Sequence, residues 1–136
     1  MARVRMGMVG GGEGAFIGAI HRMAAALDGE IQLVCGAFSS DSDRSRRSGA
    51  LLNLSPERTY SHYEDMMSAE ADLPADQRME FVAMVTPNHL HFPVAKAALQ
   101  SGFHVMSDKP ATFDLAEALQ LRQLVQDTGL LYGLTH

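Results

Sequence analysis

A glycine-rich stretch, residues 9–18, constrains the fold of this 136-residue chain more than any other segment. Five glycines fall within nine positions, after an apolar run at 4–9 and before residues 16–27, whose apolar side chains recur at helical spacing. Glycine permits a tight turn and a close approach of the backbone to a pyrophosphate, and a helix that starts there offers free N–H groups. The strand–turn–helix context predicts a dinucleotide-binding loop. The alternative is a turn that only packs the helix against a sheet.

Two spacings within this stretch fit glycine patterns of that kind. Gly10, Gly12 and Ala15 match G-x-G-x-x-[GA], and Gly12, Gly14 and Gly18 form a looser frame. We expect the cofactor at the turn and the first helical residues, on Gly10, Gly12, Gly14, Ala15, Phe16 and Ile17. The apolar stripe expected on the buried face of the helix comprises Phe16, Ile20, Met23, Ala24 and Leu27.

The rest of the chain alternates between segments typical of strands and segments typical of helices. The expected strands are residues 4–9, 31–38, 80–85, 103–106 and 130–134, and 58–60 could add a short one. The expected helices are residues 16–27, 40–52, 63–68, 92–100 and 115–127, and Ser40 with Asp43 resembles a capping box for the second of them. This alternation requires parallel strands joined by right-handed crossovers. It predicts an α/β fold with a doubly wound parallel sheet, in a single domain over residues 1–136.

Composition and charge argue against several classes of function. The formal net charge is −5 and the chain has no block of lysine and arginine, so no nucleic-acid partner is expected. The single cysteine, Cys35, excludes an internal disulfide and fits a reducing compartment. Without a signal-peptide pattern or a membrane-length apolar stretch, we expect a cytoplasmic protein with no membrane partner. The six histidines show no recognised ligand spacing, so no metal site is expected.

Two polar runs follow later strands, at the sheet edge where open parallel sheets bind their ligands. They are Thr86-Pro87-Asn88 and Asp108-Lys109-Pro110. Asn88 can hydrogen-bond a ribose hydroxyl, although a Pro-Asn pair is also an ordinary turn. Lys109 can bind a ribose or substrate hydroxyl and help to move a proton. The alternative is a surface lysine paired with Asp108.

The end of the second expected strand bears on the choice between NAD and NADP. NAD-binding folds usually place an acid there for the ribose 2′-hydroxyl, whereas this chain has Ser39 and Ser40. With Arg44, Arg46 and Arg47 in the following helix, these hydroxyl residues suit a 2′-phosphate, which slightly favours NADP. Asp41 and Asp43 oppose this interpretation, since either could take the acidic role. A capped helix with a solvated charged face is a further alternative.

The combination of these motifs resembles the N-terminal nucleotide-binding domain of the glucose-fructose oxidoreductase / inositol dehydrogenase / rhizopine catabolism (Gfo/Idh/MocA) family. The resemblance covers essentially the whole chain. The residues that carry it are the glycine loop with Gly18 and His21-Arg22, then Thr86-Pro87-Asn88-His89-Leu90-His91, Gly102-Phe103-His104-Val105 and Asp108-Lys109-Pro110.

The resemblance implies a Rossmann fold, a nicotinamide cofactor, and hydride transfer to or from a sugar, inositol or related polyol. It implies that Lys109 is the catalytic and cofactor-contacting lysine. Asp108 stands where the family usually has Glu, and Pro110 matches the family's proline. The glycine loop, Ser39, Ser40 and Arg44 are already expected to contact the cofactor. The resemblance implies further cofactor contacts at Thr86, Pro87, Asn88, His91, Asp108, Lys109 and Pro110.

Family members continue into a second, substrate-binding domain that supplies further catalytic residues, so this chain is expected to be inactive alone and to form homo-oligomers when full length. For that reason His136 is not assigned the family's histidine role. Two alternatives remain from other classes. A non-catalytic NAD(P)-binding sensor or scaffold needs no second domain. A methyltransferase shares the strand–glycine–helix start, but it usually has an acid where this chain has Ser39.

Overall fold

Five parallel strands in the order β2-β1-β3-β4-β5 form the sheet of the computed structural model, which describes residues 2–135. The strands are β1 (Val4–Gly10), β2 (Ile31–Ala37), β3 (Phe81–Val85), β4 (His104–Ser107) and β5 (Tyr132–Leu134). The helices are α1 (Phe16–Ala26), α2 (Ser42–Leu51), α3 (Tyr63–Asp72), α4 (His91–Gln100) and α5 (Leu115–Thr128), with short 3-10 turns at Pro56–Arg58 and Asn88–Leu90. His136 lies outside the described residues.

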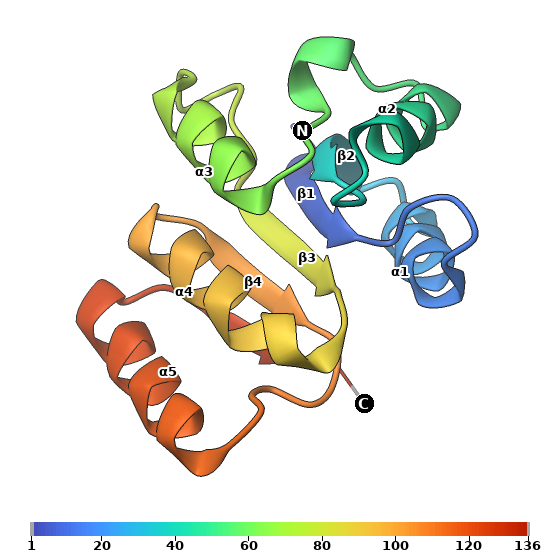
Figure 1. Ribbon diagram of the computed structural model, residues 1–136. Coiled ribbons are helices and arrows are strands. Elements are labelled where there is room, and N and C mark those ends of the chain that lie inside the picture. The colour runs from blue at the N-terminus through green and yellow to red at the C-terminus, as the bar shows by residue number, and fades with distance from the viewer. Residues whose placement is uncertain (1, 136) are drawn as a thin grey trace.

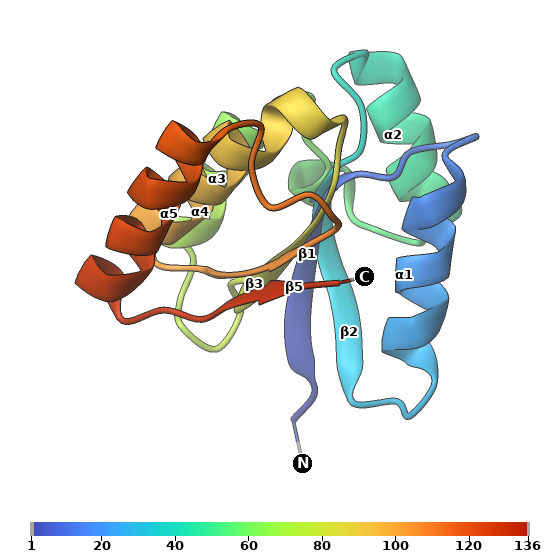
Figure 2. The ribbon, with the colours of Figure 1, turned by 90° about the horizontal axis from the view of Figure 1, so that it is seen from below.

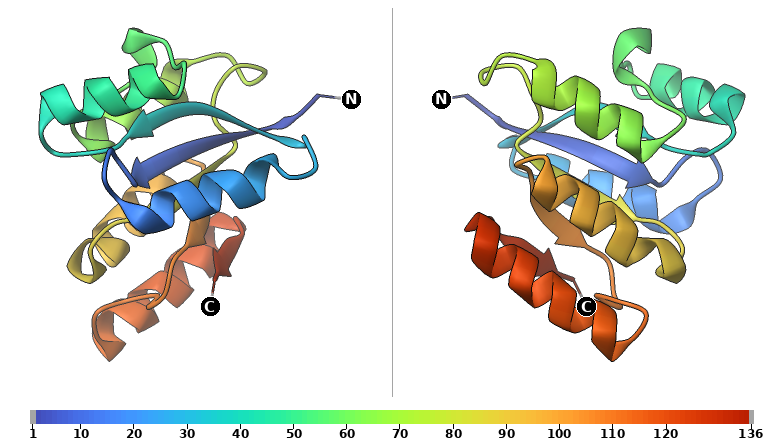
Figure 3. Two further views of the ribbon diagram at one scale, coloured as in Figure 1. Left: turned by 90° about the vertical axis from the view of Figure 1, so that its right-hand side faces the viewer. Right: turned by 60° about the vertical axis from the view of Figure 1, so that its left-hand side comes forward.

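The helices cover the sheet on both faces, as a doubly wound fold requires (Figures 1 and 2). Helices α1 and α2 lie on one face, over a core built around Met6, Met8 and Phe38. Helices α3, α4 and α5 lie side by side on the other face (Figure 3), over a larger core that includes Met84 and Phe103. The predicted fold class is confirmed. Within residues 2–135, no helix has the length and apolarity needed to cross a bilayer.

The apolar stripe of α1 faces solvent, so its assignment to the buried face was wrong. Phe16 is 79% exposed and Leu27 is 86% exposed. The helix is turned this way because Gly18 lies against the glycine loop. A Cβ on Gly18 would come within 2.4 Å of the Gly11 Cα. This close contact brings the small-residue side of α1 to the sheet, where Ile17 packs against the core, and it turns the larger side chains outward.

Three element boundaries also differ from expectation, each for a local reason. Residues 58–60 form no strand, because Pro56 starts a 3-10 turn and only a single parallel bridge joins Thr59 to Gly36. Asp41, rather than Ser40, caps α2, and its carboxylate accepts the Arg44 N–H at 3.1 Å. Helix α3 continues beyond residue 68 to Asp72, because the backbone before Pro74 is the first that disfavours helix.

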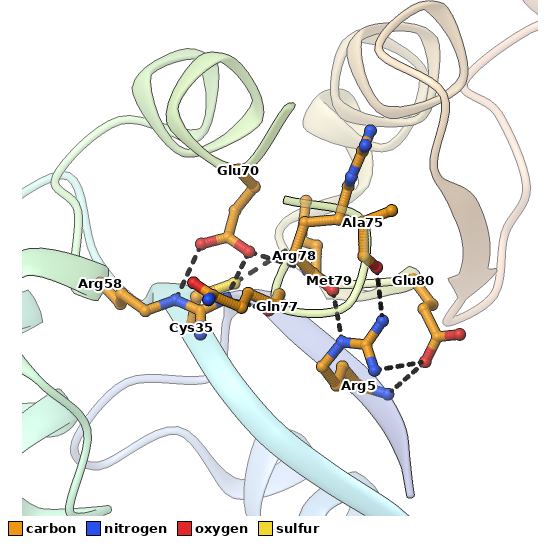
Figure 4. A network of polar contacts seen from close by, with 9 residues as sticks. All are labelled: Arg5, Cys35, Arg58, Glu70, Ala75, Gln77, Arg78, Met79 and Glu80. Atoms are coloured by element: carbon orange, nitrogen blue, oxygen red, sulfur yellow. Dashed lines mark hydrogen bonds and ion pairs between the residues drawn. The ribbon is translucent and has the colours of Figure 1, made fainter. Parts of the chain in front are cut away.

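A buried ion pair lies between α3 and the start of β3 (Figure 4). The Glu70 carboxylate is fully buried and accepts two hydrogen bonds from Arg58, at 2.6 and 3.0 Å. It also accepts the Met79 N–H at 2.8 Å. Cys35 lies beside this group, with its sulfur 3.6 Å from that of Met79. Nearby, Arg5 donates to the carbonyls of Ala75 and Arg78, so the connection into β3 is held from both sides.

We expect stability to fall as the pH rises above about 8.5–9, mainly because of Cys35. Burial, and then the charge of Glu70, raise the pKa of the Cys35 thiol well above its usual value. The same causes raise the pKa of Tyr60 to about 12. In this alkaline range the unfolded chain releases the thiol proton while the folded chain keeps it. Each such proton costs about 1.4 kcal/mol of stability per pH unit.

Urea unfolding at pH 7.5, 8.5 and 9.5 checks this expectation. The matched variant is Cys35→Ala, which lacks the thiol and should lose less stability over the same interval, whatever its stability at pH 7.5. Equal losses for the two proteins would contradict a role for the thiol.

Candidate dinucleotide-binding site

A cavity of about 490 Å³ opens at the carboxyl edge of the sheet, between the ends of β1, β2 and β3. Four chain segments line it, and three of them carry predicted site residues: the glycine loop, the end of β2 with the start of α2, and the run after β3. The lining residues are Val9, Gly10, Gly11, Gly12 and Ala15, then Ala37, Phe38, Ser39, Ser40 and Arg44, then Ser61, His62, Tyr63 and Glu64, then Val85, Thr86, Pro87 and Leu90. The size and position fit a ligand held across the strand ends.

The glycine loop comes closer to neighbouring backbone than any side chain would allow. Gly10 has a φ of +84°, and a Cβ there would lie 2.8 Å from the Val85 carbonyl oxygen. A Cβ on Gly12 would lie 2.8 Å from the Phe38 carbonyl oxygen. The loop therefore fills little of the space between β1, β2 and β3, and it leaves that space to a ligand.

Helix α1 begins at the cavity without a cap. Its N-cap residue, Ala15, offers no side-chain acceptor, and the first turn holds no acidic residue. The first N–H groups of a helix have no partner within the helix, and the helix dipole adds positive potential at the same point. These donors therefore suit a pyrophosphate, and the residues at this end of the cavity fit a dinucleotide.

Hydrogen bonds from α1 and α2 hold the loop in this shape. Ser48 Oγ accepts the Glu13 N–H at 2.8 Å, and Arg44 donates twice to the Glu13 carbonyl, at 2.5 and 3.1 Å. On the other side, Arg22 donates to the Gly11 carbonyl at 2.8 Å. Burial lowers the pKa of Arg22. A loop fixed in advance loses little entropy when a ligand binds.

The residues proposed for the ribose lie where β2 ends. Ser39, Ser40 and Arg44 all line the cavity. The two acids that opposed a 2′-phosphate are engaged elsewhere: Asp41 caps α2, and Asp43 pairs with Arg46 at 3.8 Å. Neither is among the cavity residues.

The fourth lining segment, residues 61–64, was not among the predicted site residues. It supplies the carboxylate of the cavity lining, Glu64. Burial, and then a hydrogen bond with Glu64, raise the pKa of Tyr63. A signal was present, because this segment follows the short stretch at 58–60, and a strand there would end at the same sheet edge.

The run after β3 is divided between the cavity and its surroundings. Thr86 and Pro87 line the cavity, and the Thr86 hydroxyl is buried without a hydrogen-bond partner among the described residues. Asn88 is exposed and lies outside the lining. The His91 ring is only 1% exposed, and both of its nitrogens face backbone carbonyl oxygens, those of Pro110 and Thr86. The unpaired Thr86 hydroxyl suits a polar ligand, whereas His91 has no free nitrogen to offer one.

Lys109 follows β4 and is exposed, outside the cavity lining. Asp108 accepts a hydrogen bond from the Thr135 hydroxyl at 3.2 Å. The ion pairs among residues 2–135 involve Arg5, Arg46, Arg47 and Arg58, and none involves Lys109. The Lys109–Pro110 peptide bond is cis. The lysine is therefore not tied to Asp108, and its side chain is open to a ligand.

Comparisons with known proteins identify relatives of this domain. Residues 4–136 match the profile of the family described as "Oxidoreductase family, NAD-binding Rossmann fold". The uncharacterised oxidoreductase YfiI of Bacillus subtilis is 37% identical over 134 residues, which cover 98% of this chain and 34% of that protein.

Two solved structures share the fold closely. An oxidoreductase from Sinorhizobium meliloti is 46% identical with a TM-score of 0.92, and the match covers 100% of this chain and 37% of that one. An inositol dehydrogenase homologue from Azotobacter vinelandii, complexed with NADH and myo-inositol, is 40% identical with a TM-score of 0.93, covering 98% and 35%. The chain thus spans about a third of the length of these proteins.

Proposed function

We propose a function from one premise: the chain belongs to the Gfo/Idh/MocA oxidoreductase family, as its NAD-binding Rossmann-fold domain. The domain binds a nicotinamide dinucleotide for hydride transfer to or from a sugar, inositol or related polyol. The observation that carries this proposal is the uncapped start of α1 beside a braced glycine loop in a cavity of about 490 Å³. The complex of the Azotobacter vinelandii homologue with NADH and myo-inositol supports the substrate class.

The cavity and the residues beside it each have a role in this proposal, although Gly14, Phe16, Ile17 and Asn88 are not among the lining residues. The glycine loop and the first turn of α1 hold the pyrophosphate, through Gly10, Gly12, Gly14, Ala15, Phe16 and Ile17. Ser39, Ser40 and Arg44 hold the adenosine ribose, and we propose a slight preference for NADP because the neighbouring acids, Asp41 and Asp43, are not among the lining residues. Thr86, Pro87 and Asn88 lead toward the nicotinamide end, and Thr86 brings an unpaired hydroxyl.

Lys109 takes the chemical role in the proposed reaction. Oxidation of a secondary alcohol removes a hydride from carbon and a proton from oxygen, and the nicotinamide supplies the hydride acceptor when bound. The Lys109 amine accepts the hydroxyl proton, and in the reverse direction its ammonium returns a proton to the carbonyl oxygen. Its freedom from ion pairs among the described residues leaves it available for this task.

Replacing Ala15 by aspartate tests dinucleotide binding without weakening the fold. Ala15 already has extended N-cap backbone, with φ −88° and ψ 121°. A carboxylate there should cap α1 and add about 0.5–2 kcal/mol of stability. It should also occupy the N–H groups meant for the pyrophosphate and repel that anion. We expect at least a tenfold weaker affinity together with an unchanged or higher Tm.

Isothermal calorimetry of the wild-type chain and of Ala15→Asp, with NAD and with NADP, gives the affinities. Calorimetric melting of both proteins gives the Tm values. Equal affinity in the two proteins would place the pyrophosphate elsewhere. Tighter binding of NAD than of NADP at both low and moderate salt would overturn the proposed preference.

A further inference from the structure

The His91 side chain connects two segments that are distant in sequence. His91 is the first residue of α4, and its ring is buried between the end of β3 and the loop after β4. Its Nε2 lies 3.0 Å from the Thr86 carbonyl oxygen, and its Nδ1 contacts the Pro110 carbonyl oxygen. Thr86 lines the dinucleotide cavity, and Pro110 directly follows Lys109.

Few other contacts fix the backbone that carries Lys109. On one side Asp108 is anchored, because its N–H donates to the Met84 carbonyl at 3.0 Å and its carboxylate accepts from Thr135. On the other side, His91 is the one hydrogen-bond partner of the Pro110 carbonyl within residues 2–135. Within the described residues, the backbone of Lys109 itself makes no hydrogen bond. The place of Lys109 is therefore set by Asp108 before it and by His91 after it, with Tyr132 donating to the next carbonyl, that of Ala111, at 3.5 Å.

We propose that His91 is a positioning residue: its Nδ1–H donates to the Pro110 carbonyl and thereby fixes Lys109 at the nicotinamide end of the cavity. This inference rests on the proposed function, since it gives Lys109 a reaction to serve. It assigns His91 no direct contact with the cofactor. A carbonyl oxygen only accepts, so the Pro110 contact is a hydrogen bond only when Nδ1 carries a proton.

Replacing His91 by asparagine or by glutamine separates its two contacts, because each amide can keep only one of them. The amide nitrogen of Asn is bonded to Cγ, as Nδ1 is, so His91→Asn can still donate to Pro110. The amide nitrogen of Gln lies one bond farther out, as Nε2 does, so His91→Gln can donate to Thr86 instead. Both variants lose the ring, and both should lower the Tm to a similar extent.

Turnover of a polyol by the full-length protein separates positioning from packing. We expect His91→Gln to lower kcat by about 10²-fold, because a displacement of about 1 Å at a reacting group has that effect. His91→Asn should recover most of that loss. Both variants should keep an NADP affinity within about threefold of wild type. Equal kcat values for the two variants would overturn the inference, as would a loss confined to KM.

Nuclear magnetic resonance of this chain tests the same inference without any reaction. Nitrogen-15 spectra of the His91 ring should show a proton on Nδ1, with or without one on Nε2. The Lys109 side-chain resonances should move in His91→Gln and stay near their wild-type positions in His91→Asn. An unprotonated Nδ1 would overturn the inference, as would equal shifts of the Lys109 resonances in the two variants. These readouts hold even if no polyol is turned over, which would contradict the proposed function instead.

Discussion

Replacing Lys109 by methionine is expected to lower kcat and kcat/KM together, by about 10²–10⁴-fold, in the full-length protein. The lysine is exposed at the end of β4 and forms no ion pair among the described residues, so its charge contributes little to folding. Methionine keeps the apolar stem of the side chain and removes the group that moves the proton. We expect the Tm to stay within the range typical of surface substitutions, equivalent to about 0.5 kcal/mol.

Lys96→Met provides the matched control, because Lys96 lies inside helix α4 and does not follow a strand end, as Lys109 does. Kinetics with a polyol, dinucleotide titration and thermal melting are measured on the same preparations. Lys96→Met should leave turnover unchanged. Wild-type turnover in Lys109→Met would return Lys109 to an ordinary surface lysine and remove the chemical support for the proposed reaction.

The sheet was predictable because local pattern and global fold agree along this chain. Apolar runs as short as that of β3 and followed by turn residues favour buried strands, and the glycine turn before α1 leaves few other structures. The hydrophobic pattern gave the wrong orientation for α1. The apolar spacing placed Phe16 and Leu27 on the buried face, whereas the contact of Gly18 with the glycine loop turns them to solvent. A Cβ on Gly18 would lie only 2.4 Å from the Gly11 Cα, so the two segments can pack only if residue 18 is glycine. A hydrophobicity pattern does not record such a constraint.

In the candidate site too, residues that follow strand ends were predictable from the sequence, and residues placed by contacts between distant segments were not. The glycine loop, Ser39, Ser40, Arg44 and Thr86 follow strand ends, and topology brings such residues to one edge. Glu64 and its neighbours reach the cavity from the start of α3, after a stretch with no clear strand pattern. The two carbonyl partners of His91 depend on the fold of the loop after β4, so no spacing rule could have supplied them.

Replacing Arg58 by methionine is expected to destabilise the domain by about 3–5 kcal/mol, the usual cost of removing one partner from a buried ion pair. Glu70 is fully buried and holds two of its three hydrogen bonds with Arg58, so the variant leaves a buried carboxylate with only the Met79 N–H. For a domain of this size the loss corresponds to a fall in Tm of about 10–20 °C. The Arg46–Asp43 pair is the control, since its side chains are 71% and 80% exposed. Arg46→Met should cost no more than about 0.5 kcal/mol.

The double variant Arg58→Met/Glu70→Met identifies the cause of this loss. If an uncompensated buried charge is responsible, removing Glu70 as well should recover part of the stability, because apolar pairs often replace buried ion pairs without loss. The remaining deficit should be about 1–3 kcal/mol, since the Met79 N–H then has no acceptor. Urea unfolding of the four proteins gives these differences. A double variant less stable than Arg58→Met, or an Arg58→Met that loses no more than Arg46→Met, would show that the pair at Glu70 does not hold the entry to β3 in place.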